Sequence, residues 1–315
     1  MGPNTTLLKN DGSSYSILGE AFIQYNAKDL GTKTTFKMGR QKLNTPLAGA
    51  DDARMLPNLF EAAVLSNTDI EDTTLILAHI SQMTVGTFGN VYSPGALSIQ
   101  SGYGLGFKEA TSGNFAEMGV VALGAGTDTS GVTTGAVIYK GIDNLTLQAW
   151  DYYAHDILNA VYLQADYEWN CLLNENVKMN ASAQYIDQSD VGGSLAGKVD
   201  SDYWGVKLGA SSGAFSAYAA YSQTGESDGT TSGGIITPWG SIPVFTQGMV
   251  TRHQFFSDTD SWKVAGTYKL NELLGADVKA SGFYTEFEIG ATNSYVNGTA
   301  WKVPESGFNI QYQAP

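Results

Sequence analysis

Two carboxylates and one guanidinium fall close together in the N-terminal part of the chain. Asp51, Asp52 and Arg54 occupy one short segment, and Pro46 and Pro57 flank it. Opposed charges on two sides of a narrow aqueous passage create a field across it; Asp/Glu rings select cations, whereas Arg/Lys rings select anions. The alternative is that these are solvated loop charges without a ligand. We therefore expect this segment either to select ions or to do no chemistry.

Charged residues on both sides of that segment could extend the same site. Lys37, Arg40 and Lys42 precede it, and Glu61 follows it. Lys37 and Arg40 have opposite parity along an extended strand, so both face one passage only if Gly39 marks a β-bulge. On this hypothesis a constriction is bordered by Asp51, Asp52, Arg54 and Glu61, and the wall beside it is lined by Lys37, Arg40 and Lys42.

A second set of charges lies farther along the chain, on the polar faces of alternating segments. Its members are Asp166, Glu168, Lys178, Lys207, Lys263 and Lys269. They would line the lumen of a barrel or face bulk water on a soluble sheet, and both interpretations put the same side chains on one face. Only closure of the sheet distinguishes the two.

Other catalytic or ligand-binding chemistry has little support. The three histidines, His79, His155 and His253, are scattered and have no cysteine partner at metal-ligand spacing. The glycine-rich run 102–107 lacks the full spacing of a dinucleotide-binding loop. No paired-carboxylate or nucleophile signature can be placed. We expect no enzyme activity, no metal site and no cofactor.

The composition excludes several classes of protein. The 315 residues include 37 glycines, carry a net charge of −14, and are 43% hydrophobic and 15% charged. So acidic a chain is a poor partner for nucleic acid, because phosphate contacts need clustered Lys and Arg. One cysteine, Cys171, excludes a disulfide framework, and no apolar run reaches the roughly 18 residues of a transmembrane helix. A large antiparallel β protein fits these numbers.

Alternation with a period of two predicts the elements that must position the charges. Apolar and polar residues alternate in 158–169, and 177–185, 262–270 and 308–313 repeat the pattern. The apolar faces tend to end in Tyr or Trp, like the aromatic girdles of transmembrane barrels. Segments of about ten residues match a tilted strand crossing a membrane, whereas soluble strands average about 5–6 residues.

We expect the connections to alternate between short and long. The short ones span 29–32, 69–72, 141–144, 170–176, 211–213 and 271–275, and the long ones span 44–60, 84–133, 187–201, 225–260 and 289–304. Outer-membrane barrels have short periplasmic turns and longer extracellular loops, whereas a soluble sandwich has no reason to alternate. The pattern keeps 114–124, which looks like a strand or short helix, inside the long extracellular loop 84–133.

About 13 membrane crossings follow from this assignment. They lie near 15–27, 33–43, 61–69, 73–83, 134–141, 145–154, 158–169, 176–187, 202–211, 214–224, 261–270, 276–288 and 306–313. Single-chain bacterial barrels have an even number of strands. The odd count and the lack of a signal peptide therefore predict that the chain is truncated at both ends.

One region carries a specific family resemblance. Residues 39–46 (GRQKLNTP) and 50–61 (ADDARMLPNLFE) resemble the constriction-loop region of the outer membrane porin D (OprD) family, and most closely its major-outer-membrane-protein-like branch. The regions 141–162 and 255–268 are similar to that family in order and spacing. The resemblance spans most of the chain, but only the first region is sharp.

The resemblance implies an all-β fold, an antiparallel transmembrane β-barrel that has 18 strands in the family. Residues 1–315 would form one partial barrel domain, with 44–61 as a constriction loop folded into a lumen that basic residues line. The function implied is passive diffusion of ions and small charged solutes across the outer membrane of a Gram-negative bacterium. This sequence is poorer in lumenal Arg than the family and has the additional segment 114–124, so the solute stays open.

The expected partners are outer-membrane lipid, lipopolysaccharide and small charged solutes, with a homotrimer as one option and no nucleic acid. Two other functions remain open. The barrel could be structural or adhesive, with long loops closing the lumen, and conductance would separate it from a porin. The chain could instead be a soluble all-β binding protein, whose loops should not alternate and whose apolar strand faces should not end in aromatic residues.

Overall fold

One antiparallel β-sheet accounts for most of the fold. The computed structural model describes residues 13–51, 56–86, 98–100, 102, 104–227 and 233–313. The strands are β1 (Ala21–Asn26), β2 (Thr34–Gln41), β3 (Leu59–Asn67), β4 (Thr73–Thr84), β5 (Ala116–Glu117), β6 (Val132–Ile142), β7 (Leu145–Ala154), β8 (Leu158–Cys171), β9 (Asn174–Asp190), β10 (Asp200–Ser212), β11 (Phe215–Thr224), β12 (Thr259–Lys269), β13 (Asp277–Ile289) and β14 (Trp301–Gln313). The helices are α1 (Met118–Leu123) and α2 (Asn271–Leu274), with 3-10 turns at Ala27–Leu30 and Ser98–Gln100.

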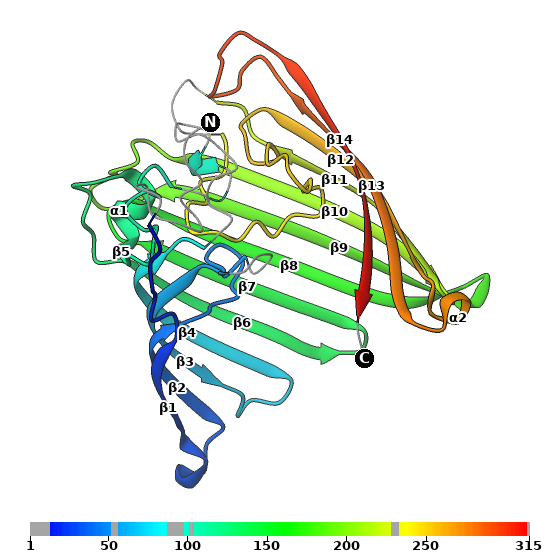
Figure 1. Cartoon of the computed structure of the whole chain (residues 1–315), viewed down its shortest axis with the longest axis horizontal. Coiled ribbons are helices and arrows are strands. Elements are labelled where there is room, and N and C mark those ends of the chain that lie inside the picture. The colour runs from blue at the N-terminus through cyan, green and yellow to red at the C-terminus, as the bar shows by residue number, and fades with distance from the viewer. Residues whose placement is uncertain are drawn as a thin grey trace.

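Strands that follow one another in the chain are also neighbours in the sheet. The order is β1-β2-β3-β4-β6-β7-β8-β9-β10-β11-β12-β13-β14, with each pair antiparallel, and β5 pairs with β4 beside this path. Figure 1 shows the sheet curving along this order, with α1 and the yellow segment before β12 lying against it near one end of the strands. The predicted crossings correspond one to one with the strands of the path, which confirms the all-β antiparallel prediction.

The two faces of the sheet differ as the alternation predicts. On β8, Leu163 and Tyr167 are 42% and 45% exposed, whereas Tyr162 is 1% exposed. The face of Leu163 is apolar and open, and we call it the outward face. The face of Tyr162 carries the polar residues and is covered by loop segments, and we call it the inner face. This is the arrangement of a barrel with lipid outside and water inside.

The last strand starts earlier than predicted. The sequence pattern places the crossing at 306–313, whereas β14 begins at Trp301. Lys302, Pro304 and Glu305 interrupt the apolar alternation in between. Pro304 cannot donate a ladder hydrogen bond, but among the described strands β14 pairs only with β13, and an edge position tolerates proline.

The predicted alternation of short and long connections is wrong at one place. Residues 155–157 join β7 to β8 at the end of the sheet where the other connections are long. The turn is closed by a hydrogen bond from the Ile157 N–H to the Ala154 carbonyl oxygen, at 3.0 Å. Asp156 accommodates it with a φ of 61°, a conformation that Asp adopts more readily than most residues.

The segment between β4 and β6 is packed rather than extended. Its strand β5 continues the pairing of β4, and Met118, Val121 and Ala122 of the short helix α1 are fully buried. These side chains join the main hydrophobic cluster, which also takes in the inner face of the sheet. Of the helices described, none has the length and apolar character to cross a bilayer.

Candidate functional site

The first segment on the inner face, 42–58, connects β2 to β3; its residues 52–55 are outside the described part of the chain. Asn58 fixes its shape. The Asn58 N–H donates to the Ala50 carbonyl at 2.8 Å, and the side-chain amide donates to the Gly49 carbonyl at 3.0 Å. The Asn58 Oδ1 accepts the Gly86 N–H at 2.8 Å, which ties the segment to the end of β4.

The same segment reaches across the sheet. Leu47 is buried, and its N–H donates to the hydroxyl of Tyr152 on β7 at 3.3 Å. Tyr152 is fully buried on the inner face. The segment therefore extends over β3, β4 and β6 to contact β7, and lies over the inner face.

A second segment lies on the inner face, residues 233–257 between β11 and β12, and we call it the belt. Near its start, Ile236 exchanges two hydrogen bonds with the Gln188 side chain of β9, at 2.7 and 2.8 Å. Farther along, the hydroxyl of Thr285 on β13 donates to the Thr246 carbonyl at 2.8 Å. On β12, the Lys263 ammonium donates to the Gln247 carbonyl at 2.6 Å.

Residues 249–251 of the belt lie against the last strand. The Glu305 carboxylate of β14 accepts the backbone N–H groups of Met249, Val250 and Thr251, at distances between 2.8 and 3.2 Å. It also accepts the Thr251 hydroxyl. The segment 243–251 thus runs along the inner wall from β9 to β14, and Ser241 and Pro243 also line a cavity with β7 and β8.

The alternating pattern does not predict the belt, because it assigns 225–260 to one of the long connections. A signal was present. Ile235, Ile236, Trp239, Phe255 and Phe256 are large apolar residues in a region without strand periodicity, and all are buried. A loop that extends into solvent would expose these large apolar side chains to water. Their density in the sequence therefore indicates a loop that folds inward.

The belt and the 42–58 segment contact each other directly. Ala48 and Trp239 form a parallel bridge, and the Gly49 N–H donates to the Trp239 carbonyl at 3.1 Å. Gly240 permits this approach: its φ is 97°, and a Cβ there would come within 2.4 Å of the Gly49 carbonyl oxygen. A side chain at 240 would force the two segments apart.

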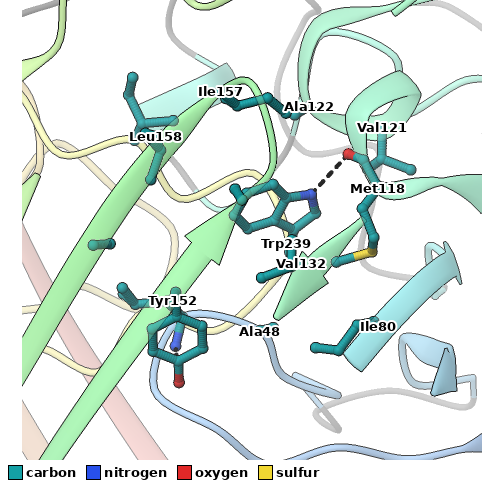
Figure 2. Packing of buried hydrophobic residues seen from close by; sticks show 14 of the residues in the cluster. Ala48, Ile80, Met118, Val121, Ala122, Val132, Tyr152, Ile157, Leu158 and Trp239 are labelled. Carbon is teal, nitrogen blue, oxygen red and sulfur yellow. Dashed lines mark hydrogen bonds between the residues drawn. The ribbon is translucent and has the colours of Figure 1, made fainter. Parts of the chain in front are cut away.

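Trp239 also joins the two segments to α1. Its indole N–H donates to the Met118 carbonyl at 2.9 Å, and its side chain belongs to the buried cluster that includes Val132 and Ile157 (Figure 2). Trp239 is 2% exposed. Three connections that are far apart in the sequence therefore meet at one buried side chain.

An ion pair lies beside this junction. The Arg252 guanidinium of the belt is 3.3 Å from the Asp51 carboxylate, and their side chains are 3% and 26% exposed. Asp51 has a φ of 43°. Asp51 therefore borders the junction with its charge balanced by a partner 201 positions away. Asp52 and Arg54, the other predicted members of this group, lie outside the described residues.

The structure does not bring the remaining predicted constriction and wall residues to the same place. Arg40 and Glu61 pair with each other at 2.7 Å. They share the face of the exposed Met38, opposite to Lys37, because pairing of β2 with both neighbours continues in register through Gly39. The register shift lies instead between β3 and β4, at Glu61. Lys42 is exposed just beyond the end of β2.

The other predicted wall residues have the parity of the inner face. Asp166, Ser182, Lys207, Ala220 and Lys263 form one continuous row across β8 to β12. The row carries one carboxylate and two ammonium groups. Lys207 and Lys263 are separated by one strand, so their backbones lie about 10 Å apart.

Both lysines border a cavity of about 560 Å³ between the wall and the belt, lined also by Asn180, Tyr218 and Gln247. The Lys207 ammonium lies 4.6 Å from the centre of the Phe245 ring of the belt. The cavity is a place where an anion could meet two fixed positive charges.

The remaining predicted charges lie away from this row. Glu168 and Lys178 are exposed on the inner face nearer the short turns, and Lys269 ends β12 at that same edge. Lys37 lies over the Phe22 ring at 3.8 Å, near the start of the sheet. These groups are accessible, but they do not converge with Asp51.

A second cavity, of about 370 Å³, lies where the 42–58 segment meets the wall. Gln148, Trp150, Tyr162 and Gln164 line its wall side, and Asp51 lines its loop side. The Trp150 indole N–H donates to the Gln148 side chain at 3.0 Å. Tyr162 and Gln164 occupy polar positions of the alternating segment 158–169, but no charge marks them as candidate site residues.

Burial perturbs one titratable group of the belt. It lowers the pKa of His253 below the ordinary imidazole value, and the nearby Glu305 carboxylate opposes this shift more weakly. The ring packs edge-on against Phe256 with 4.8 Å between the ring centres. Among the described residues, no group of three or more His, Cys, Asp or Glu side chains is placed to hold a metal ion.

Residues 3–274 match the model of the family described as outer membrane porin, OprD family. The curated proteins contain no match.

Three solved structures share the described fold. Pseudomonas aeruginosa OccD3 (OpdP) is 18% identical with a TM-score of 0.71, over 95% of this chain and 68% of that one. Acinetobacter baumannii OccAB3 is 14% identical with a TM-score of 0.69, over 90% and 64%. Pseudomonas aeruginosa OccK10 (OpdN) is 14% identical with a TM-score of 0.62, over 90% and 76%.

Proposed function

Because the chain belongs to the OprD family of outer membrane porins, we propose that its channel is narrowest where the 42–58 segment meets the belt, and that small anionic solutes pass it in preference to cations. The channel acts by passive diffusion and does no covalent chemistry. The backbone groups of the wall pair between strands, so that the wall is compatible with lipid. The family consists of outer membrane porins, and we propose that this chain catalyses no reaction.

The observation that supports the position of the constriction is the contact between the two inner segments. The Ala48–Trp239 bridge and the Arg252–Asp51 ion pair join segments that start from different parts of the wall. Such a junction reduces the cross-section available to a solute. The predicted loop 44–61 therefore contributes one side of the proposed constriction, and the belt contributes the other.

The proposed preference for anions rests on the charges of the inner face. Lys37, Lys178, Lys207 and Lys263 share the inner face with Asp166 and Glu168, so the predicted wall residues on this face have an excess of basic groups. The charge of Asp51 is balanced by Arg252, and the Glu305 carboxylate is occupied by the belt. Walls with an excess of Lys favour anions, so small carboxylates are the proposed solutes.

Planar bilayer recording tests the proposal. We expect stable single-channel openings and, across a salt gradient, a reversal potential of the anion-selective sign. The Lys207→Gln/Lys263→Gln variant should move the reversal potential toward zero. Lys302→Gln, which removes one positive charge from the outward face, should leave it unchanged.

Two outcomes contradict the proposal. Insertion without conductance would favour a structural or adhesive barrel. Conductance with a reversal potential of the cation-selective sign would support a porin but exclude the proposed selection of anions by Lys207 and Lys263.

Contacts with the membrane and with other copies complete the proposal. The outward face meets outer-membrane lipid, and we propose that its end near the long connections contacts lipopolysaccharide. A homotrimer stays a prediction, and the mass of the protein after chemical cross-linking in detergent would check it.

A further inference from the structure

A polar cluster interrupts the apolar outward face near the long connections. His79, Thr133, Tyr153 and Asn159 form one row across β4, β6, β7 and β8, and His155 follows directly after β7. We call these five residues the rim cluster. On a face that meets hydrocarbon, a row of polar side chains has to lie at the level of the lipid headgroups.

Hydrogen bonds organise the rim cluster. The Thr133 hydroxyl lies 3.1 Å from His79 Nδ1 and 3.0 Å from His155 Nε2. The Tyr153 ring packs edge-on against His155, with 4.9 Å between the ring centres. A single hydroxyl bridges two imidazoles, so in the described structure the second nitrogen of each ring remains able to bind another group. Next to them, Asn159 donates to the Asp151 carboxylate at 2.8 Å.

An apolar groove opens on the same face below the rim cluster. It has a volume of about 420 Å³, its floor is Ala149, Ala165 and Ala183, and its sides include Leu147, Leu163 and Tyr185. Val137, which also borders it, lies four positions along β6 from Thr133. At the rise of an antiparallel strand that is about 13 Å, which is less than the roughly 20 Å depth of one leaflet, so one lipid molecule can span both.

We propose that the rim cluster and the groove form a binding site for one lipopolysaccharide molecule of the outer leaflet. The imidazole nitrogens bind a headgroup phosphate, the Asp151 carboxylate accepts a hydroxyl or amide N–H of the headgroup sugar, and an acyl chain fills the groove. The occupant is a lipid because the groove is continuous with the face that contacts lipid in an outer membrane porin. The inference rests on that membrane location and does not depend on where the channel is narrowest or which ions it selects.

Native mass spectrometry of the delipidated protein, titrated with diphosphoryl lipid A, tests the site. We expect one tightly bound lipid per chain. The groove-filling variant Ala149→Leu/Ala165→Leu should weaken binding about tenfold, whereas Ala217→Leu/Ala219→Leu, which adds the same bulk to the outward face of β11, should not. The His79→Ala/His155→Ala variant should weaken binding of phosphorylated lipid A and leave binding of its dephosphorylated form unchanged.

The controls keep the outcomes distinct. Heat-modifiable migration in gels establishes that each variant is folded, and bilayer conductance reports separately on the channel. Equal lipid binding by the wild type, both leucine variants and the histidine variant would overturn the proposal. A dimer or trimer that the groove-filling variant abolishes would overturn it too, because the groove would then hold a second copy of this chain.

Discussion

Asp51 pairs with a residue that no local sequence pattern predicts. Arg252 is buried in the belt and lies 201 positions from Asp51 in the chain. Breaking a fully buried ion pair costs about 3–5 kcal/mol. Asp51 is a quarter exposed, so water can take over part of the lost interaction. The pair therefore joins the two inner segments. Removal of either residue leaves the charge of the other only partly compensated.

We expect Arg252→Gln to destabilise the junction by about 2 kcal/mol, less than the loss of a fully buried pair. The loosened segments should produce noisier single-channel currents with frequent sublevels. Recording at a fixed voltage measures this directly. Lys302→Gln removes the same charge from an exposed ion pair with Glu288 and should leave the noise at the wild-type level. Currents as quiet as those of the wild type in Arg252→Gln would show that the Arg252–Asp51 ion pair does not hold the two segments together.

His253 should make the belt sensitive to acid. Burial lowers its pKa, so between the folded and unfolded pKa values the unfolded belt binds more protons than the folded one. Stability is therefore lost as the pH falls below about 6.5, the ordinary imidazole value. We expect the melting temperature to fall from pH 7.5 to pH 5.5, and His253→Leu to reduce that fall. A His79→Gln variant, altered on the outward face, should retain it; an identical pH profile for His253→Leu contradicts the assignment.

The belt covers part of the inner face, and Glu305 binds its residues 249–251. The carboxylate accepts three backbone N–H groups and one hydroxyl. Hydrogen bonds to a charged group contribute about 1.5–3 kcal/mol. A neutral amide cannot accept all four, and its own N–H groups would face the donors of the belt.

Glu305→Gln should therefore release the segment 249–251 while the wall stays intact. Limited proteolysis after Arg252 with trypsin checks this: we expect faster cleavage in Glu305→Gln than in the wild type. Glu286→Gln, an outward carboxylate on β13, provides the matched control. Equal cleavage of all three proteins would show that the belt is held elsewhere.

Strands and belt differ in how far they could be predicted from the sequence. Strands such as β8 and β9 carry their inner and outer faces as an alternation that can be counted in the sequence, and the register places Asp166, Lys207 and Lys263 on one face of the sheet. The belt has no period, because its residues are placed by separate contacts with β9, β12, β13 and β14. Arg40 shows the same limit, since its face depended on a bulge at Gly39 that is absent from the described register.

At the scale of the whole molecule, three connections converge on one side of a curved wall. The 42–58 segment, the belt and α1 meet at Trp239, and all three contribute side chains to the main hydrophobic cluster. The wall itself is thin and keeps its apolar side outward. In this porin family the strands cross the membrane, and we propose that the convergent segments set the width of the aqueous path.

Single-channel conductance of a chain with a shortened belt tests that proposal most directly. Residues 237–247 would be replaced by a short Gly-Ser linker, and shortening of the exposed connection 192–197 provides the control. We predict that the shortened belt raises conductance several-fold and admits larger solutes in liposome swelling, whereas the control matches the wild type. Unchanged conductance with a shortened belt would contradict the account, because the narrowest part of the channel would then lie elsewhere.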